Sequence, residues 1–555
     1  MATTAIDRDR WRPLALLLIG LAAAWRLLDL DARCLWFDEA FSWQLTRFPW
    51  AEMIDRARMD VHPPLYYVGL KLWTGAFGDS VFAMRLLSVA WFCVALAGAY
   101  LLCGEVDRGR AVDGTTMGGS GEPGLVSMLF LASSPFLFRY SQEARMYTQM
   151  AALTLLSTWL LLRAMRERLR PAWWWTAYGV SAAALAYTHN FGLFTLAAQG
   201  CLAAGSLLVS SRERGLRPWR DPTARWALAT AALTVALYLP WVPTLLAQQA
   251  QVSRDYWAQS VNAHPPTELA YWRDTALSCL LHNRANLAAP FRWDLAGETP
   301  LGDALLLAVG LGLGVLAWRR GSGGWCLLVG VVVPIELAIL ASIEVNRNII
   351  GYRYLTPSFV LTLVGLACVI GLARPRLVRL ALAGAAFGGM IYLTYQHQAS
   401  LGLPERAEFR RAADHIAEGR RPGDFVVCAN PTDFFPMKYH ARGRFDVRQA
   451  RYPGMVVRHY TGGPIYQEGD FLPWPKALGR KDRRVWVVTR DSDRPSLDRP
   501  GRYVHVETVR FPEAFRWRGD VSVHLWEPAR PPIASSTVGD AHEVPRSSDS
   551  APAKD

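Results

Sequence analysis

Long apolar runs, separated by short charged or proline-containing segments, fill the first 400 residues of the chain. Each run approaches the roughly 20 apolar residues that a bilayer-spanning helix needs. We predict about eleven spanning helices, near 13–30, 81–103, 123–139, 146–164, 173–189, 191–210, 225–246, 301–318, 325–342, 355–373 and 378–395. The first run is longer than a signal-peptide core and has no convincing cleavage site, so we expect it to remain as an anchor.

After Gln396 the apolar runs stop and the composition becomes that of a soluble protein. The pattern predicts a helix over 406–418 and strands over 424–429, 484–489, 504–509 and 521–526. The predicted fold class is therefore a polytopic α-helical membrane protein with a small C-terminal α/β domain. We expect a membrane domain over 1–399 and a soluble domain over 400–528. The tail 529–555 is rich in Pro, Ser and Ala, which is typical of disorder.

Arginine distribution predicts the orientation of the chain. Clusters of arginine precede the first predicted span and follow the fourth, sixth, eighth and tenth, which all fall on one side of the membrane if there are eleven spans. Basic short loops stay in the cytoplasm. The segments 31–80 and 247–300 and everything after Gln396 are therefore predicted to be extracytoplasmic, in a multi-pass protein of the cell (inner) membrane.

The two predicted outer segments carry aromatic residues typical of the membrane interface. Within 31–80, the stretches 48–54 and 62–77 favour helices that lie at the surface and cover a cavity. The segment 247–300 contains Trp257, Tyr271, Trp272 and Trp293, which fit an interfacial aromatic belt.

Charge and cysteine content narrow the function further. The net charge of +13 comes largely from the basic loops, and no soluble basic patch with interleaved aromatics accompanies it, so we expect no nucleic-acid partner. The eight cysteines form no CxxC pair and no Cys/His metal spacing.

Two adjacent carboxylates, Asp38 and Glu39, directly follow the first apolar run. Acidic groups next to hydrocarbon are costly unless they serve a function. At the mouth of a cavity they can accept a hydroxyl proton or, together with His62, hold a divalent cation. The alternative interpretation is ordinary solvation at the end of a span.

Further polar candidates lie on the same predicted face. Glu143 and Arg145 fall between the third and fourth spans and either pair with each other or serve as a second acid and a phosphate contact. Arg353 precedes the tenth span and either contacts a lipid phosphate or extends to the interface. His62 and His189 are each more often structural than functional when considered alone.

Six motifs occur in order on this face: RLLDLDARCLWFDEAFS, HPPLYY, FGDSVFAMRLLS, SPFLFRYSQEARMY, LPWVP and GYRYLTP. Together they resemble the GT-C class of membrane glycosyltransferases, over about residues 14–400. The closer resemblance is to the branch of protein O-mannosyltransferases, the lipid A aminoarabinose transferase and RgtA/B/C/D-like enzymes. The segment 247–300 is too short for the β-trefoil insert of the eukaryotic mannosyltransferases.

The resemblance implies a polyprenyl-phosphate-linked sugar donor and an outward-facing active site. It implies that Asp38 is catalytic and that Glu39 fills the second acidic position. It also implies substrate-binding roles for Arg145, Tyr147, Arg353 and Tyr354. The expected reaction is transfer of the sugar by single displacement to a hydroxyl of an extracytoplasmic protein, lipid or glycan, with inversion at the sugar carbon.

Two other classes of function compete with this interpretation. A polyprenyl-lipid flippase or transporter would use the acidic pair as a proton relay, and predicts charges at mid-membrane depth and repeated halves. A non-catalytic envelope assembly protein would need no carboxylate pair in a covered cavity. The mostly apolar, unduplicated spans favour the transferase.

Overall fold

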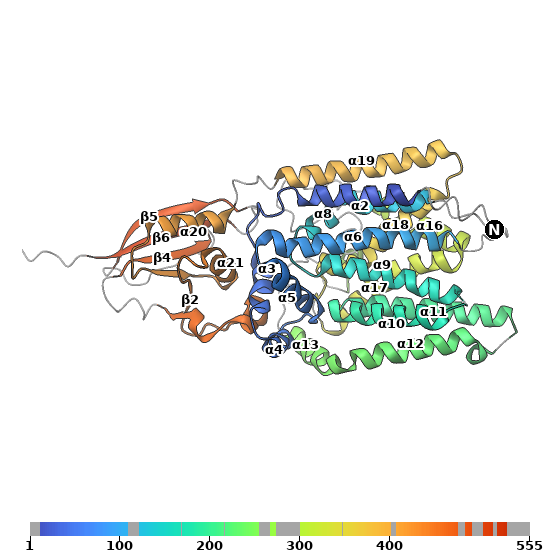
Figure 1. Cartoon of the computed structure of the whole chain (residues 1–555), viewed down its shortest axis with the longest axis horizontal. Helices are drawn as coiled ribbons and strands as arrows, with labels where there is room; N and C mark the ends of the chain where they lie inside the picture. Colours follow the sequence, from blue (N-terminus) through green and yellow to red (C-terminus); the bar gives the residue numbers. More distant parts are fainter. Residues whose placement is uncertain are drawn as a thin grey trace, which may run out of the picture.

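The computed structural model describes residues 11–108, 121–167, 169–215, 217–254, 267–273, 300–346, 348–400, 407–474, 483–490, 503–513 and 519–529. A bundle of long helices forms one end of the molecule and a six-stranded sheet forms the other (Figure 1). The short helices α3, α4 and α5 lie between the two. The predictions for the tail and for most of 247–300, including Trp257 and Trp293, fall outside the described residues.

The helical part begins with α2 (Arg12–Leu27), α3 (Phe37–Thr46), α4 (Trp50–Arg58), α5 (Leu65–Phe77), α6 (Val81–Val106), α7 (Glu122–Ser133), α8 (Pro135–Ser141) and α9 (Tyr147–Arg166). It continues with α10 (Pro171–Thr188), α11 (Gly192–Glu213), η1 (Pro218–Arg220), α12 (Pro222–Tyr238), η2 (Leu239–Trp241) and α13 (Val242–Arg254). It ends with α16 (Pro300–Arg320), α17 (Ser322–Glu344), η4 (Tyr352–Leu355), α18 (Thr356–Gly371) and α19 (Arg376–Ser400).

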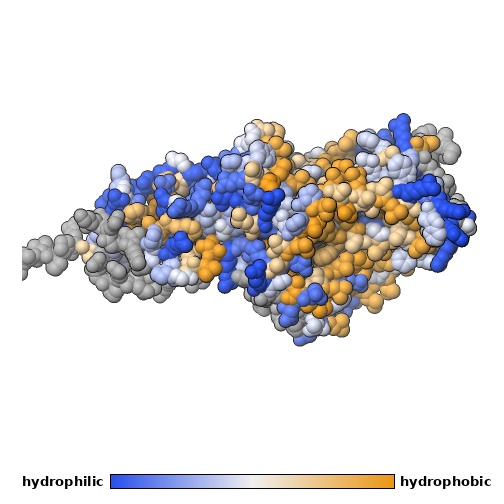
Figure 2. Space-filling model, turned by 90° about the horizontal axis from the view of Figure 1, so that it is seen from below, coloured by the Kyte–Doolittle hydropathy of each residue, from blue (hydrophilic) through white to orange (hydrophobic). Residues whose placement is uncertain are grey.

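All eleven predicted spans coincide with helices. Within the described residues, six helices are long and apolar enough to cross a membrane. The number eleven remains a prediction. The face of the bundle seen in Figure 2 is largely apolar, with hydrophilic residues at the end far from the sheet, as expected of a protein whose middle lies in hydrocarbon.

The third predicted span is divided where the sequence reads Ser133-Ser134-Pro135. Pro135 has no N–H to continue the ladder of α7, so a new helix starts there. The Ser134 hydroxyl accepts the Leu137 N–H at 3.3 Å as the cap of α8. The short helix α8 then leads to the segment 142–146, which lies beside the start of α3.

The C-terminal part contains α20 (Glu408–Gly419), β1 (Phe425–Cys428), α21 (Pro431–Ala441), β2 (Arg448–Arg451), η5 (His459–Thr461), η6 (Gly463–Ile465), η7 (Glu468–Asp470), β3 (Phe471–Pro473), β4 (Val485–Arg490), β5 (Tyr503–Phe511) and β6 (Val521–Pro528). The strand order is β3-β2-β1-β4-β6-β5, and the first four strands are parallel. Strands β6 and β5 are antiparallel additions at one edge. The predicted α/β pattern is present, and β1, β4, β5 and β6 match the four predicted strands.

The α/β part packs on the bundle through α21, which contacts α3. The rings of Trp43 and Tyr439 meet edge to face with centroids 5.0 Å apart. The Asp79 carboxylate accepts from Trp43 Nε1 and from Arg442, both at 2.8 Å. The α/β part therefore packs against α3, the helix that carries Asp38 and Glu39.

Candidate active site

Glu39 lies in a buried ion pair with Arg85 of α6, and both residues are 1% exposed. Arg85 Nε donates to Glu39 Oε1 and Nη2 donates to Oε2, each at 2.7 Å. The three remaining guanidinium donors bind the backbone oxygens of Leu30, Arg33 and Cys34 at 2.8–3.1 Å. All five N–H donors of Arg85 are thus used, which is the condition under which a buried ion pair is tolerated.

The Glu39 carboxylate also binds two other segments of the site. Oε1 accepts the Ala144 N–H at 2.9 Å, and Oε2 accepts the Trp36 N–H at 3.4 Å. We call Glu39, Arg85 and these partners the clamp. It joins the loop before α3, the start of α3 and the segment 142–146, which places Asp38 and Arg145 side by side. Every oxygen of Glu39 is occupied, an environment unlike that expected of a catalytic base.

Asp38 faces a different environment although it is the preceding residue. Its Oδ2 lies 3.0 Å from Arg353 Nη1, and its side chain is 16% exposed. No described residue donates a well-aligned hydrogen bond to that oxygen. Asp38 is therefore held on one side only, by Arg353, and its side chain is partly exposed.

Aromatic rings hold the Arg353 guanidinium in place. Its central carbon lies 5.4 Å from the ring centroid of Trp36, 5.6 Å from that of Tyr147 and 5.7 Å from that of Tyr354. These contacts are at cation–π distance. The short helix η4 presents Arg353 immediately before α18, at the start of the tenth predicted span.

Arg145 is a buried cation with only neutral partners. It is 3% exposed, and its Nη1 lies 3.4 Å from the Asp38 backbone oxygen, 3.2 Å from Ser42 Oγ and 3.3 Å from the Tyr67 hydroxyl. Its Nε has no partner among the described residues. The pairing of Arg145 with the Glu143 side chain, one of the two options in the sequence, is not formed. A buried guanidinium without a carboxylate is suited to an anionic ligand.

We call Asp38, Arg145 and Arg353 the cluster. Glu143 is buried beside it at 3% exposure, and its Oε1 has no partner in the described part of the chain. Burial raises the pKa of the Glu143 carboxyl to about 7, although the positive charge of Arg139 opposes the shift. Glu143 is consequently close to half protonated at neutral pH.

Two buried histidines, His62 and His189, lie beside these residues. His62 Nδ1 lies 3.0 Å from Asp60 Oδ2, so it donates to that carboxylate and leaves Nε2 as an acceptor. His189 Nδ1 accepts the Phe191 N–H at 3.1 Å, so its proton is on Nε2. The two rings are 5.4 Å apart. Burial lowers the pKa of the His62 imidazole, although the Asp60 carboxylate opposes the shift.

The structure brings the predicted candidates to one end of the bundle, with Glu39 in the clamp and the others around Asp38. Sequence reasoning did not single out Asp60, Ser42, Tyr67 or Arg85. Asp60 had a weak signal, an acid two residues before His62, and Arg85 is a charge inside an apolar run. Within the described ranges, no group of three or more His, Cys, Asp and Glu side chains could hold a metal ion. Since Glu39 is also bound by Arg85, the set Asp38, Glu39 and His62 does not fit a cation, and we derive no step through one.

No protein-family model matches the chain, and no curated protein matches its sequence. In structure, the chain is similar to ArnT from Cupriavidus metallidurans bound to undecaprenyl phosphate, with a TM-score of 0.56 and 13% identity over 92% of this chain and 98% of that one. It is similar to the apo form of ArnT, with a TM-score of 0.55 and 13% identity over 93% and 98%. It also matches the oligosaccharyltransferase AglB from Archaeoglobus fulgidus, with a TM-score of 0.48 and 12% identity over 86% and 70%.

ArnT belongs to the branch that the motifs resemble. The chain therefore has the fold of the GT-C membrane glycosyltransferases, as the resemblance implied. At 13% identity this similarity establishes the fold.

Proposed function

We propose that the chain is a membrane glycosyltransferase that moves a sugar from a polyprenyl-phosphate-linked donor to a hydroxyl group on the extracytoplasmic side. One observation carries the proposal: two guanidinium groups lie beside Asp38 at one end of a GT-C fold, that of Arg353 at its carboxylate and that of Arg145 at its backbone oxygen. ArnT, which shares this fold, has been solved with undecaprenyl phosphate bound. A lipid-borne phosphate supplies the anion that Arg145 lacks.

In the proposed reaction the acceptor hydroxyl attacks the anomeric carbon of the donor. A bond forms between that carbon and the acceptor oxygen, while the bond from the carbon to the phosphate oxygen breaks. The hydroxyl proton passes to Asp38, and the polyprenyl phosphate leaves with the electron pair. Displacement from the opposite face inverts the anomeric configuration. Glycosyl transfer passes through an oxocarbenium-like state, so an anion near the sugar and cations near the leaving phosphate lower the barrier.

Asp38 and Arg353 have to change partners for this reaction. The Arg353 guanidinium lies 3.0 Å from Asp38 Oδ2, so that oxygen is already engaged in an ion pair. A donor phosphate competes for the same guanidinium because planar guanidinium groups bind phosphate well. Donor binding thereby frees Asp38 to accept a proton, so the base becomes active only when the donor is present.

The other residues have supporting roles in the proposal. Glu39 and Arg85 position Asp38 and Arg145 through the clamp and do not touch substrate. Tyr147 and Tyr354 hold Arg353 and offer ring faces to a sugar. His62, His189 and Glu143, which lie beside these residues, are assigned as hydrogen-bonding groups for substrate.

The experiment uses purified protein in lipid nanodiscs with radiolabelled polyprenyl-phosphate sugars and an extract of cell-envelope acceptors. Asp38→Asn should lower transfer by about 10²–10⁴-fold while donor binding persists, since general-base catalysis contributes on that scale. Asp55→Asn is the matched control, because Asp55 is an exposed partner of Arg58 on α4. Equal transfer by Asp38→Asn and the wild type would remove Asp38 from the mechanism. An absence of transfer with every donor, together with Asp38-dependent movement of the lipid across the bilayer, would favour the flippase.

A further inference from the structure

Helix α17, one of the six that are long and apolar enough to cross a membrane, carries a carboxylate far from both of its ends. Glu336 lies 14 residues after the first residue of α17, Ser322, and 8 residues before the last, Glu344. These separations correspond to about 21 and 12 Å at a rise of 1.5 Å per residue. In the six candidate spans, Glu336 is the one Asp, Glu, Lys or Arg that lies more than five residues from both ends. In hydrocarbon roughly 30 Å thick, its carboxylate is therefore remote from both headgroup layers.

Glu336 lies on the outer face of α17. The other face of this helix packs against α11, α16 and α18, and the contact with α18 is close, because a Cβ added at Gly330 would lie 2.7 Å from Leu361 Cδ1. Glu336 is exposed. About one turn away in each direction, Val332 is 37% exposed and Leu340 is 53% exposed. We call Val332, Glu336 and Leu340 the α17 stripe, an apolar surface with a carboxylate at its centre.

The carboxylate of Glu336 has no partner within the described part of the chain, where it forms neither a hydrogen bond nor an ion pair. Charged side chains at this depth are costly in hydrocarbon, and they are almost always paired with another group or face a water-filled space. Long basic side chains near the ends of a span escape this cost by extending to the interface. A glutamate side chain is too short to cover the roughly 12 Å to the nearer end of α17. Glu336 therefore requires a partner from outside the bundle.

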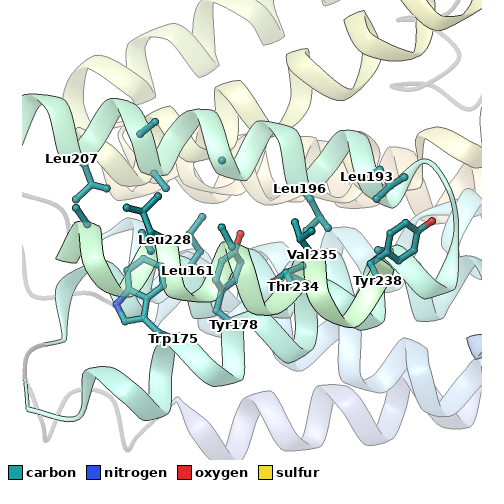
Figure 3. A pocket seen from close by; sticks show the side chains of 18 of the residues that line it. Leu161, Trp175, Tyr178, Leu193, Leu196, Leu207, Leu228, Thr234, Val235 and Tyr238 are labelled. Carbon is teal, nitrogen blue, oxygen red and sulfur yellow. The ribbon is translucent and has the colours of Figure 1, made fainter. Parts of the chain in front are cut away.

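A groove elsewhere on the same bundle provides a comparison. It runs between α10, α11 and α12, has a volume of about 770 Å³, and has no charged residue in its lining (Figure 3). Hydrocarbon chains satisfy such a surface, since Leu193, Leu207 and Leu228 in its lining have no side-chain polar group. The α17 stripe differs from the groove because its carboxylate needs a hydrogen-bond donor or a cation, which hydrocarbon chains lack.

We propose that the α17 stripe is the docking surface for a transmembrane helix of another protein, and that this helix carries a lysine or arginine at the depth of Glu336. Charge complementarity supports this partner, because an ammonium or guanidinium group satisfies the carboxylate in hydrocarbon. Val332 and Leu340, each four residues from Glu336, form with it a ridge of the kind that packs into the groove of a neighbouring helix.

The same argument disfavours a second copy of this chain as the partner. In the six candidate spans, every Lys and Arg lies within five residues of a span end, so none of these spans offers a cation at the depth of Glu336. The proposal is independent of the proposed function, because α17 contributes none of the candidate active-site residues. A failure of sugar transfer would leave it untouched, and the reverse also holds.

The first test uses the full-length protein in phosphatidylcholine vesicles with a leucine-rich transmembrane peptide that has one lysine at its centre. Energy transfer between dyes on the protein and the peptide measures association. The wild type should bind this peptide roughly 3–30-fold more tightly than the same peptide with leucine at that position, and Glu336→Leu should abolish the preference. Glu344→Leu is the matched control, since Glu344 is an exposed glutamate at the end of the same helix. Equal binding of both peptides to the wild type, or a preference that persists in Glu336→Leu, would overturn the proposal.

The second test examines the natural partner in membranes of the cells that make this protein. A photoreactive amino acid at position 340 should cross-link α17 to a membrane protein whose attached spanning segment contains a lysine or arginine, and Glu336→Leu should abolish that product. Thermal melting and unchanged sugar transfer verify that Glu336→Leu is folded. Cross-links between two copies of this chain, cross-links to lipid alone, or a partner segment without a basic residue would each contradict the assignment.

Discussion

The clamp around Glu39 and the cluster around Asp38 are one residue apart in the chain and opposite in character. In the clamp, Arg85 uses all five donors and Glu39 accepts from Arg85, Ala144 and Trp36. In the cluster, Asp38 has one oriented charge partner, and Arg145 has no carboxylate partner among the described residues. Both regions are largely shielded from water, so the difference lies in the hydrogen bonding and not in burial.

The difference distinguishes the charges that stabilise the fold, those of Glu39 and Arg85, from the charges around Asp38 that are proposed to bind substrate. Buried polar groups are nearly always satisfied in stable structures, and exceptions tend to fall at functional sites. The clamp follows the rule and holds three segments together. The cluster and its neighbours depart from it, because Arg145, Glu143 and His189 each have a buried polar atom with no partner among the described residues.

Removing the cation of the clamp should have the largest effect. Arg85→Met leaves Glu39 as an unpaired buried carboxylate and is expected to lower the free energy of unfolding by about 3–5 kcal/mol. Thermal or denaturant unfolding in detergent measures the change. Arg58→Met removes an exposed ion pair on α4 and serves as the control, with an expected change below about 1 kcal/mol. A change in Arg85→Met as small as that of the control would show that the clamp does not stabilise the fold.

Altering the cation of the cluster should affect binding and leave stability almost unchanged. Arg353→Lys keeps the charge and loses the planar fork that binds phosphate in two places, so donor affinity should fall by about 10–100-fold. The melting temperature should stay near that of the wild type. Arg319→Lys, at an exposed position at the other end of the bundle, is the control. Normal donor affinity in Arg353→Lys would place the phosphate elsewhere.

The smallest expected effect concerns the unpaired acid Glu143. Its folded pKa of about 7 lies above the value of about 4.3 for an unfolded glutamate. The folded state therefore binds the proton more tightly, and the stability that this provides is lost as the pH rises through about 7. Glu143→Gln should remove this loss and be more stable than wild type at pH 8.

Unfolding curves collected from pH 4.5 to pH 8 measure this effect, with Glu52→Gln on the surface of α4 as control. The advantage of Glu143→Gln should shrink towards the acidic end of the range. Parallel pH profiles for Glu143→Gln and wild type would show that folding does not raise the pKa of the Glu143 carboxyl.

The sequence predicted the elements whose physical signal is local. Apolar runs of bilayer length located the helices, and alternation located β1, β4, β5 and β6. Strands β2 and β3 have only four and three residues, too few to show a period of two, and they pair because β1 lies beside them. The break at Pro135 lay inside one apolar run and became visible only with the structure.

For the site, the sequence identified the residues and could not assign their partners. Asp38 and Glu39 looked equivalent because both are acids at the end of a span. Their roles separate only because α6 brings Arg85 to one of them and η4 brings Arg353 to the other, from 46 and 315 positions away along the chain. Arg85 itself was hidden within an apolar run, and Asp60 became notable only when its contact with His62 was seen.

The most direct test of this account measures thermal stability and sugar transfer together for Asp38→Asn and Glu39→Gln. Asp38→Asn should melt like the wild type and lose transfer while it still binds the donor. Glu39→Gln should melt at a clearly lower temperature, because Arg85 loses its charge partner. A stable, inactive Glu39→Gln together with an active Asp38→Asn would contradict the assignment of the base to one residue and of the clamp to its neighbour.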